Sequence, residues 1–264
     1  MKVGILCREN CDITRQTIQS FEEAGMKISL LLMETDERTK RSKTEKDFIQ
    51  NHRIHHFRMI RSRKGSMAYL AHRLYGALPK WVMALRKKVR GKAGKPLAEL
   101  AKAKGIALSQ VARHSSKAAC QAVEAHQIEY LLLASSAWLI KKPLLDYVKV
   151  INGHNALLPN HRGLDSMQWS VLEGDPTGIT AHIIDEGVDT GPILKFREVK
   201  SKAGEDMAEF RTRIFAQRPS LFVEVIKGLA GGTITARPQG EGIHHRPMTA
   251  DELWDAEMKL ASQS

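Results

Sequence analysis

The chain has few cysteines, few aromatic residues and no long apolar run. Its 264 residues include three cysteines, and aromatic residues make up 6% of the total. A small, odd number of cysteines argues against a disulfide framework. No stretch of about 18 apolar residues occurs, so a transmembrane helix is not expected. The N-terminal MKVGILC runs into polar RENCD rather than into the apolar segment of a secretory signal. These absences predict a cytoplasmic protein.

Residues with the spacing of a metal site are also scarce. Cys7 and Cys11 lie close in sequence, but no Cys/His cluster of zinc-site spacing completes them, and buried thiols are the simpler interpretation. His52, His55 and His56 come without the cysteine or carboxylate partners that a metal site needs. We therefore expect no metal from the sequence.

The net charge of +12 is concentrated in one segment. Between Asp36 and Lys95 there are 18 Lys/Arg and four Asp/Glu, so this segment carries +14 and the rest of the chain −2. Three interpretations stay open: a solvated lid or extra helical layer, a site that clamps the phosphates of an anionic ligand, or contact with membrane headgroups or nucleic acid. Aromatic residues are sparse in this segment, which disfavours a base-stacking platform for nucleic acid.

Short apolar runs and helical periodicities alternate along the rest of the chain. This alternation is typical of an α/β domain with a mostly parallel sheet and helices on both faces. The expected strands are residues 2–7, 27–33, 106–111, 130–134, 148–151, 179–184 and 196–199. The expected helices are residues 14–24, 115–126, 205–228 and 249–260, with Thr249 and Glu252 in capping-box positions of the last. Inside a basic insertion at 36–104, we expect an extended piece at 53–60 and a helix at 66–90, kinked at Pro79.

The most informative stretch is Ile151–Leu194, INGHNALLPNHRGLDSMQWSVLEGDPTGITAHIIDEGVDTGPIL. Asn152 and His154 end an apolar strand and, because side chains alternate with period two, face the same side. At the carboxyl edge of a parallel sheet, that side can face the crevice where ligands bind. An Asn amide stabilises an oxyanion, a histidine moves a proton near neutral pH, and Asp189 would orient the imidazole if it reaches it. This set fits acyl transfer to an amine, although a turn with a hydrogen-bonded histidine and an ordinary acidic turn account for the same residues.

Two segments, INGHNALLPNHRG and TGITAHIIDEGVDTGPIL, match a two-part pattern in order and spacing. The pattern is Asn-x-His before Leu157-Leu158-Pro159 and Arg162-Gly163, then Asp189-Thr190-Gly191 in an acidic turn. It resembles the formyltransferase family that uses 10-formyltetrahydrofolate, which includes glycinamide ribonucleotide, methionyl-tRNA and amino-sugar N-formyltransferases. The resemblance covers residues 105–194 well, the first strand–helix–strand unit loosely and 36–104 hardly at all. It implies a Rossmann-like α/β fold, a formyltransferase, and 10-formyltetrahydrofolate as the formyl donor.

The resemblance also implies roles for individual residues. Asn152 would bind the formyl oxygen in the tetrahedral intermediate, His154 would stabilise it and assist proton transfer, and Asp189 would hold His154 and an ordered water. The family contacts the folate pteridine through two segments, which in this sequence contain Ala137, Trp138, Leu139 and Ile140, and Asp185, Gly187 and Val188. Core packing after a strand is the alternative for Trp138 and Leu139.

Departures from the family pattern bear on the acceptor. Asn155 stands where many members have proline, and residues 8–12 read RENCD, without the glycines that glycinamide ribonucleotide enzymes carry after the first strand. Only 70 residues follow Leu194, which weakens tRNA as the acceptor. We therefore expect an anionic small amine, first of all an amino sugar carried on a nucleotide. The predicted acceptor contacts are Arg8, Asn10, Asn155 and Arg162.

These observations predict one catalytic domain at residues 1–200, with the basic insertion inside it and a helical tail at 201–264 packed on it. Nucleic acid is not an expected partner, whereas peripheral membrane contact through the insertion and a homodimer are compatible with the sequence. Two alternatives remain for the function. One is a 10-formyltetrahydrofolate hydrolase that uses the same residues with water as the acceptor, and the other is a non-catalytic protein that binds polyanions or membranes.

Overall fold

The computed structural model describes residues 1–9, 11–35, 49–53, 55, 96–136 and 139–262. Its main sheet has seven strands: β1 (Val3–Arg8), β2 (Leu30–Glu34), β3 (Ala107–Val111), β4 (Tyr130–Leu133), β5 (Lys149–His154), β7 (Gly178–Ile183) and β8 (Ile193–Glu198). Their spatial order is β3-β2-β1-β4-β5-β7-β8. The first five strands pair in parallel, and β7 pairs antiparallel with both β5 and β8. The predicted α/β fold with a mostly parallel sheet is confirmed.

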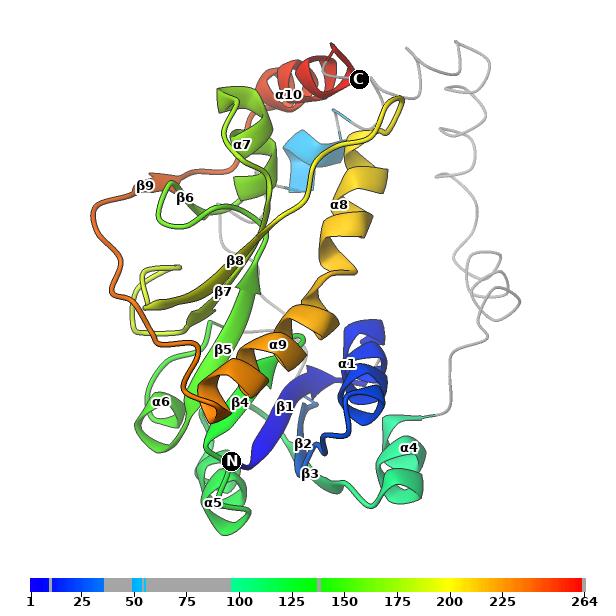
Figure 1. The fold of residues 1–264 in the computed structure, drawn as a ribbon, viewed down its shortest axis with the longest axis vertical. Coiled ribbons are helices and arrows are strands. Elements are labelled where there is room, and N and C mark those ends of the chain that lie inside the picture. Colours follow the sequence, from blue (N-terminus) through cyan, green and yellow to red (C-terminus); the bar gives the residue numbers. More distant parts are fainter. Residues whose placement is uncertain (10, 36–48, 54, 56–95, 137–138, 263–264) are drawn as a thin grey trace.

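Helices cover both faces of this sheet (Figure 1). They are α1 (Asp12–Glu23), α4 (Leu97–Lys104), α5 (Lys117–Ala125), α6 (Leu144–Tyr147), α7 (Ser166–Glu173), α8 (Met207–Phe215), α9 (Arg218–Ala230) and α10 (Ala250–Ser262). Because successive side chains of a strand point to opposite faces, Ile5 of β1 packs in the core under α1, α4 and α9, and Leu6 packs in the core under α5 and α6. Both side chains are fully buried.

The strand order creates a crevice at one edge of the sheet. From β1 the chain proceeds outward to β2 and β3, then crosses to β4 and β5 on the other side of β1. Ligands of such doubly wound sheets bind beyond the carboxyl ends of the strands, near the point where the order reverses. Strand β5 ends at this edge with Asn152 and His154. The antiparallel pairing with β7 places them opposite His182 and Thr180.

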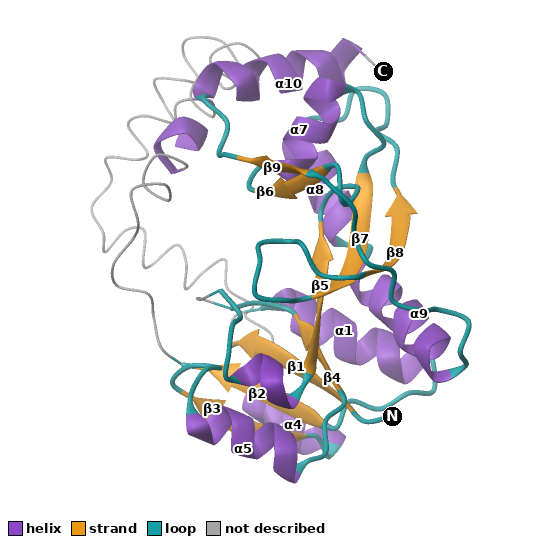
Figure 2. Ribbon diagram, turned by 90° about the vertical axis from the view of Figure 1, so that its left-hand side faces the viewer, coloured by secondary structure: helices purple, strands orange, loops and turns teal. Residues whose placement is uncertain are grey.

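A small second sheet lies between the main sheet and the C-terminal helix (Figure 2). It consists of β6 (His161–Gly163) and β9 (Ile243–His245), which pair in parallel. Helix α10 packs on α7 and begins with the predicted capping box, in which Glu252 N–H donates to Thr249 Oγ1 and Thr249 N–H donates to Glu252 Oε2. None of the helices in the described ranges is long and apolar enough to cross a membrane.

The predicted helix at 205–228 is wrong in one respect, because it is two helices. The chain breaks between Phe215 and Arg218, where Pro219 enters the first turn of α9. Proline has no N–H to donate, and its ring clashes with the carbonyl four residues earlier, so a helix is kinked or broken at this point. The break directs α8 and α9 along different axes (Figure 1).

The described part of the basic insertion is more helical than the sequence predicts. Its last part, to which the sequence analysis assigns no element, forms α4, whose Leu97 and Ala101 are buried in the main core and which ends at Gly105 in the left-handed conformation. Arg53, expected in an extended piece, lies in a helical stretch at residues 49–53. The expected helix at 66–90 and its kink at Pro79 lie outside the described residues. The division into 1–200 and 201–264 stays a prediction.

Thr180 connects the loop after β5 to β7 by hydrogen bonds, and their contribution to stability can be tested. Its buried hydroxyl donates to Ala156 O at 2.6 Å and accepts from Leu158 N–H at 3.3 Å. We expect Thr180→Val to lower the free energy of unfolding by about 1–3 kcal/mol, because two buried backbone groups lose their partner. Urea denaturation measures the change, and Thr180→Ser, which keeps the hydroxyl, serves as the control. Equal stability of the valine variant and the wild type would contradict this account.

Candidate active site

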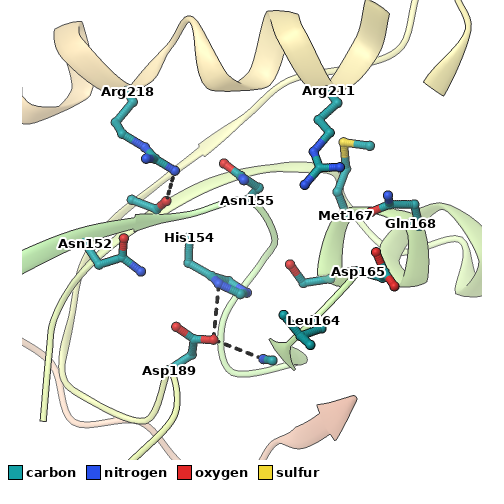
Figure 3. A pocket seen from close by; sticks show the side chains of 13 residues that line it. Asn152, His154, Asn155, Leu164, Asp165, Met167, Gln168, Asp189, Arg211 and Arg218 are labelled. Atoms are coloured by element: carbon teal, nitrogen blue, oxygen red, sulfur yellow. Dashed lines mark hydrogen bonds and ion pairs between the residues drawn. The ribbon is translucent and has the colours of Figure 1, made fainter. Parts of the chain in front are cut away.

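A polar cavity of about 280 Å³ lies at the carboxyl end of β5 (Figure 3). It gathers side chains from β5, the following loop, the start of α7, the acidic turn after β7, and helices α8 and α9. Its lining residues are Asn152, Gly153, His154, Asn155, Gly163, Leu164, Asp165, Ser166, Met167, Gln168, Asp189, Arg211 and Arg218. The three residues that the sequence predicts as catalytic, Asn152, His154 and Asp189, therefore share one cavity.

The amide of Asn152 is held by a histidine of the neighbouring strand. Its Nδ2 lies 3.3 Å from Nε2 of His182, whose Nδ1 is 3.1 Å from the carbonyl oxygen of Ile183. The carbonyl can only accept, so Nδ1 of His182 carries the proton and Nε2 accepts from the amide. An amide has two N–H groups, and one therefore stays available for a ligand in the cavity.

His154 is buried, and its two ring nitrogens have different partners. Nε2 lies 2.6 Å from the carbonyl oxygen of His161, so it donates that hydrogen bond. Nδ1 faces Asp189 Oδ2 at 3.4 Å. Burial lowers the pKa of His154 below its ordinary value of 6.5, against the opposing charge of Asp189. The neutral ring then carries its lone pair on Nδ1, and a proton taken up there would meet a carboxylate.

Asp189 keeps its negative charge although it lies in a mostly buried position. Burial alone would raise its pKa, but His182, His154 and the N–H of Gly163 together lower the pKa to about 2. Gly163 N–H donates to Oδ2 at 3.0 Å, and His182 Nε2 lies 3.6 Å from Oδ1. Each carboxylate oxygen thus faces one histidine ring, Oδ2 that of His154 and Oδ1 that of His182.

The backbone around these groups depends on two glycines. Gly163 has φ +90°, and a Cβ there would lie 2.6 Å from the carbonyl oxygen of His245. A Cβ on Gly153 would lie 2.9 Å from Nε of Arg218. Asp189 itself adopts φ 56°, a left-handed conformation that aspartate tolerates better than most residues because its short side chain bonds locally. Side chains at 153 or 163 would therefore displace the groups that surround His154.

Two arginines from the helices line the cavity opposite Asp189 (Figure 3). Arg218 is buried, its Nη2 donates to Gly153 O at 2.6 Å, and its guanidinium lies over the ring of Phe215. Burial lowers the pKa of Arg218 to about 10, so it remains charged at neutral pH. Its Nε is buried without a hydrogen-bond partner among the described residues. Arg211 is exposed and reaches the same cavity from α8. This end of the cavity is suited to an anion.

The predicted acceptor contacts have different positions in the structure. Asn155 lines the cavity, and its Oδ1 is buried without a hydrogen-bond partner among the described residues, as an acceptor for a ligand N–H would be. Arg162 is outside the cavity lining: its guanidinium donates to Gln239 Oε1 and to Gly240 O. Gln239 in turn donates to the carbonyls of Asp189 and Gly191. Arg162 therefore stabilises the acidic turn indirectly, through Gln239. Arg8 ends β1 away from the cavity lining, and Asn10 lies outside the described residues.

The predicted folate contacts are separate from this cavity lining. Leu139 is 66% exposed beyond β4, whereas Ile140 is buried in the core under α5 and α6. Ala137 and Trp138 lie outside the described residues. In the acidic turn, Asp185 accepts from Gly187 N–H and Thr190 Oγ1–H, which shapes the turn, and Val188 is 40% exposed. The roles of these residues toward a folate stay predictions.

Sequence reasoning missed His182, Arg211 and Arg218. His182 meets Asn152 only because β7 runs antiparallel to β5, and that direction is not visible in the apolar pattern. Arg218 did give a signal: it falls in helical register with the apolar positions Ile214, Leu221 and Phe222, a face that is buried. A cation on an apolar helix face indicates either a paired charge or a ligand site.

The fold and the cavity define a doubly wound α/β protein that presents an amide, an imidazole and a carboxylate at the end of its central strands. Residues 78–226 match the family model described as formyl transferase. This match spans more than half of the chain, and the protein belongs to the formyl transferase family.

Relatives in sequence include methionyl-tRNA formyltransferases. The protein of that name from Sulfurimonas denitrificans is 29% identical over 149 residues, which are 56% of this chain and 49% of the relative. The one from Thermus thermophilus is 32% identical over 161 residues, which are 60% of this chain and 52% of the relative. The chain thus spans about half the length of the curated relatives that it matches.

Solved structures share the fold at lower identity. Glycinamide ribonucleotide transformylase 1 from Symbiobacterium toebii superposes with a TM-score of 0.56 at 19% identity, covering 91% of this chain and 94% of that one. A sugar N-formyltransferase from Shewanella sp. FDAARGOS_354 gives a TM-score of 0.52 at 14% identity, with 97% and 88% covered. The arrangement of strands and helices is therefore that of the formyltransferase fold.

The state of His154 can be tested by side-chain NMR titration. We expect its pKa below 6.5 in the wild type, because burial disfavours the charged ring. Asp189→Asn removes the negative charge that favours protonation, so the His154 pKa should move further down. Asp185→Asn in the same turn is the control and should leave it in place, because that carboxylate faces Gly187 and Thr190. An unchanged His154 pKa in Asp189→Asn would show that Asp189 does not act on this ring.

Proposed function

We propose that this protein transfers a formyl group from 10-formyltetrahydrofolate to the amine of a small anionic acceptor, an amino sugar on a nucleotide being the first candidate. The observation that carries the proposal is the single cavity that combines Asn152, His154 and Asp189 with two arginines. Family membership supports the formyl chemistry and the folate donor. The arginines support an acceptor with negative charge, since guanidinium groups pair with phosphates and carboxylates.

In the proposed reaction, the acceptor amine attacks the formyl carbon and negative charge builds on the formyl oxygen. The free N–H of Asn152 donates to that oxygen, and loss of one such donor typically lowers kcat by about 10²- to 10³-fold. His182 orients the amide by accepting its other N–H. The tetrahedral intermediate collapses when the bond between the formyl carbon and the donor nitrogen breaks.

A proton has to move from the attacking amine to the leaving nitrogen of the folate. His154 takes it up on Nδ1, because Nε2 already donates to the carbonyl of His161. The resulting imidazolium faces the ionised Asp189, which stabilises it. His154 then releases the proton to the leaving nitrogen and returns to its neutral form, so atoms and charge balance over the reaction.

In this proposal the acceptor binds at the end of the cavity opposite Asp189. Its anionic group pairs with Arg211 and Arg218, and its amine N–H donates to Asn155 Oδ1. This arrangement orients the nitrogen lone pair toward the formyl carbon while the charge is fixed at a distance from it. An acceptor without an anionic group would leave the buried Arg218 without a partner of opposite charge.

Methionyl-tRNA is a second candidate acceptor, because the relatives in sequence carry the name methionyl-tRNA formyltransferase. A formyl-transfer assay with 10-formyltetrahydrofolate separates the candidates when charged tRNA and nucleotide-linked amino sugars are offered in turn. Formate release without any acceptor would instead identify a hydrolase.

His154→Ala tests the proposed proton carrier. We expect kcat to fall by about 10²- to 10⁴-fold, the usual contribution of a general acid–base. Binding of the folate, measured by thermal shift, should persist. His126→Ala is the control and should retain activity, because this exposed histidine at the end of α5 lies outside the cavity lining. Intact turnover in His154→Ala would refute the assignment.

Arg211→Gln tests the anion site at an exposed residue. We expect KM for an anionic acceptor to rise about tenfold or more, since a hydrogen bond to a charged group contributes about 1.5–3 kcal/mol. KM for an uncharged analogue of the same acceptor should not change. Arg237→Gln, an exposed arginine outside the cavity lining, is the matched control. An equal rise for charged and uncharged acceptors would exclude pairing with the anion.

A further inference from the structure

A second polar cluster lies behind the cavity, on the small β6–β9 sheet. His161 of β6 is fully buried, and His245 of β9 is 7% exposed. Nδ1 of His161 lies 3.0 Å from Nε2 of His245. Neither histidine lines the cavity that holds His154. Buried histidines whose ring nitrogens face each other need an explanation, because each nitrogen must find a proton or a ligand.

Two carboxylates from the end of α7 complete the cluster. Glu173 Oε2 lies 3.9 Å from Nδ1 of His161, the same nitrogen that faces His245. Asp175 Oδ2 lies 2.9 Å from the other nitrogen of His161, Nε2, and also accepts from Asn160 Nδ2. One ligand atom each from His161, Glu173 and His245 falls within 4.8 Å of the others.

We propose that His161 Nδ1, His245 Nε2 and the carboxylate of Glu173 bind one divalent transition-metal ion, with Zn²⁺ the best chemical match. Two imidazoles and one carboxylate are a common ligand set for zinc, and a water completes the four-coordinate geometry. Glu173 has a side-chain exposure of 39%, so the fourth position opens toward solvent.

Asp175 has the position of a supporting carboxylate. Histidines that bind a metal through one nitrogen usually donate the other N–H to a carboxylate, which fixes the tautomer and raises the basicity of the ligand nitrogen. Asp175 does this for His161. The cluster therefore holds the ligand set and also the outer partner that orients it. Two carboxylates balance the charge of a divalent ion.

The tautomers needed for binding follow from the hydrogen bonds. His161 keeps its proton on Nε2, where Asp175 accepts it, so Nδ1 offers a lone pair. Without an ion, His245 Nε2–H donates to that lone pair across 3.0 Å. With an ion, the His245 proton moves to Nδ1 and both facing nitrogens become ligands. The rings stay neutral in both forms, and the hydrogen bond keeps the ligands together before the ion arrives.

The surroundings favour an ordered site. The indole of Trp169 stacks on His245 with ring centroids 4.7 Å apart, and its Nε1–H donates to Arg246 O. The nearby cation Lys259 donates from its Nζ to Leu172 O. Packing thus fixes one ligand ring, and the ammonium group is held by another partner.

The ion would fasten the strand that supports the cavity. The carbonyl of His161 accepts the Nε2–H of His154, and two residues later Gly163 N–H donates to Asp189. A metal bound to His161, Glu173 and His245 would tie this strand to α7 and to β9. We place the ion in a positioning role, since its ligands lie outside the cavity lining.

Metal binding to the tag-free, full-length chain tests the proposal directly. After dialysis against a chelator, Zn²⁺ titration by calorimetry should give one site per chain, and Co²⁺ should give the visible bands of tetrahedral coordination. His161→Gln and His245→Gln should each abolish the site. Glu173→Gln, at a partly exposed position that should tolerate the change, should weaken it. Asp175→Asn should weaken it by about 10- to 100-fold.

His244→Gln is the matched control, because this exposed histidine lies on the same strand next to His245 and outside the ligand cluster. It should bind Zn²⁺ as the wild type does. The proposal is overturned if the wild-type chain binds neither ion, or if binding persists in folded His161→Gln and His245→Gln. Loss of the ion in His154→Gln with retention in His245→Gln would place it at the catalytic cavity and equally overturn the proposal. These outcomes do not depend on formyl transfer, so the two proposals fail separately.

Discussion

The ionised carboxylate of Asp189 is the group on which the rest of the site depends. Burial opposes its charge, yet its pKa lies at about 2, because a backbone N–H and two histidines surround it. Each partner comes from a different part of the chain: His154 from β5, His182 from β7 and Gly163 from β6. A buried charge is stable only when such partners are fixed in place, so strands, loop and turn have to be assembled before the carboxylate can act on either histidine.

The fold supplies these partners through one reversal of strand direction. A wholly parallel sheet would separate β5 and β7 by a crossover, and their side chains would meet in another register. The antiparallel pairing instead sets Asn152 opposite His182, and Asp189 of the acidic turn after β7 reaches His154 at the end of β5. Gln239 and Arg162 then hold that turn from outside. The geometry of the cavity is thus a consequence of topology as much as of the residues themselves.

Sequence reasoning succeeded where local signals suffice. Apolar runs located the main strands, and spacing within Ile151–Leu194 identified three residues that share the cavity.

Sequence reasoning failed where a feature depends on contacts between distant segments. Strands β6 and β9 have three residues each, too few for any periodicity, and they pair across about a third of the chain. The cluster of His161, Glu173 and His245 was invisible for the same reason: its spacing resembles no local metal motif. Arg218 could have been found, because its register placed a cation among buried apolar side chains.

The contact between Gly153 and Arg218 restricts which residue can occupy the middle position of the Asn-x-His motif. The guanidinium lies against the glycine backbone and bonds its carbonyl, leaving no space for a Cβ. Residue 153 is therefore not a free spacer between two functional side chains, and it is coupled to a residue 65 positions later. Among relatives, a larger residue at this position and an arginine at the start of α9 should exclude each other, so the two positions should vary together. A substitution at either position would change the backbone that carries Asn152 and His154.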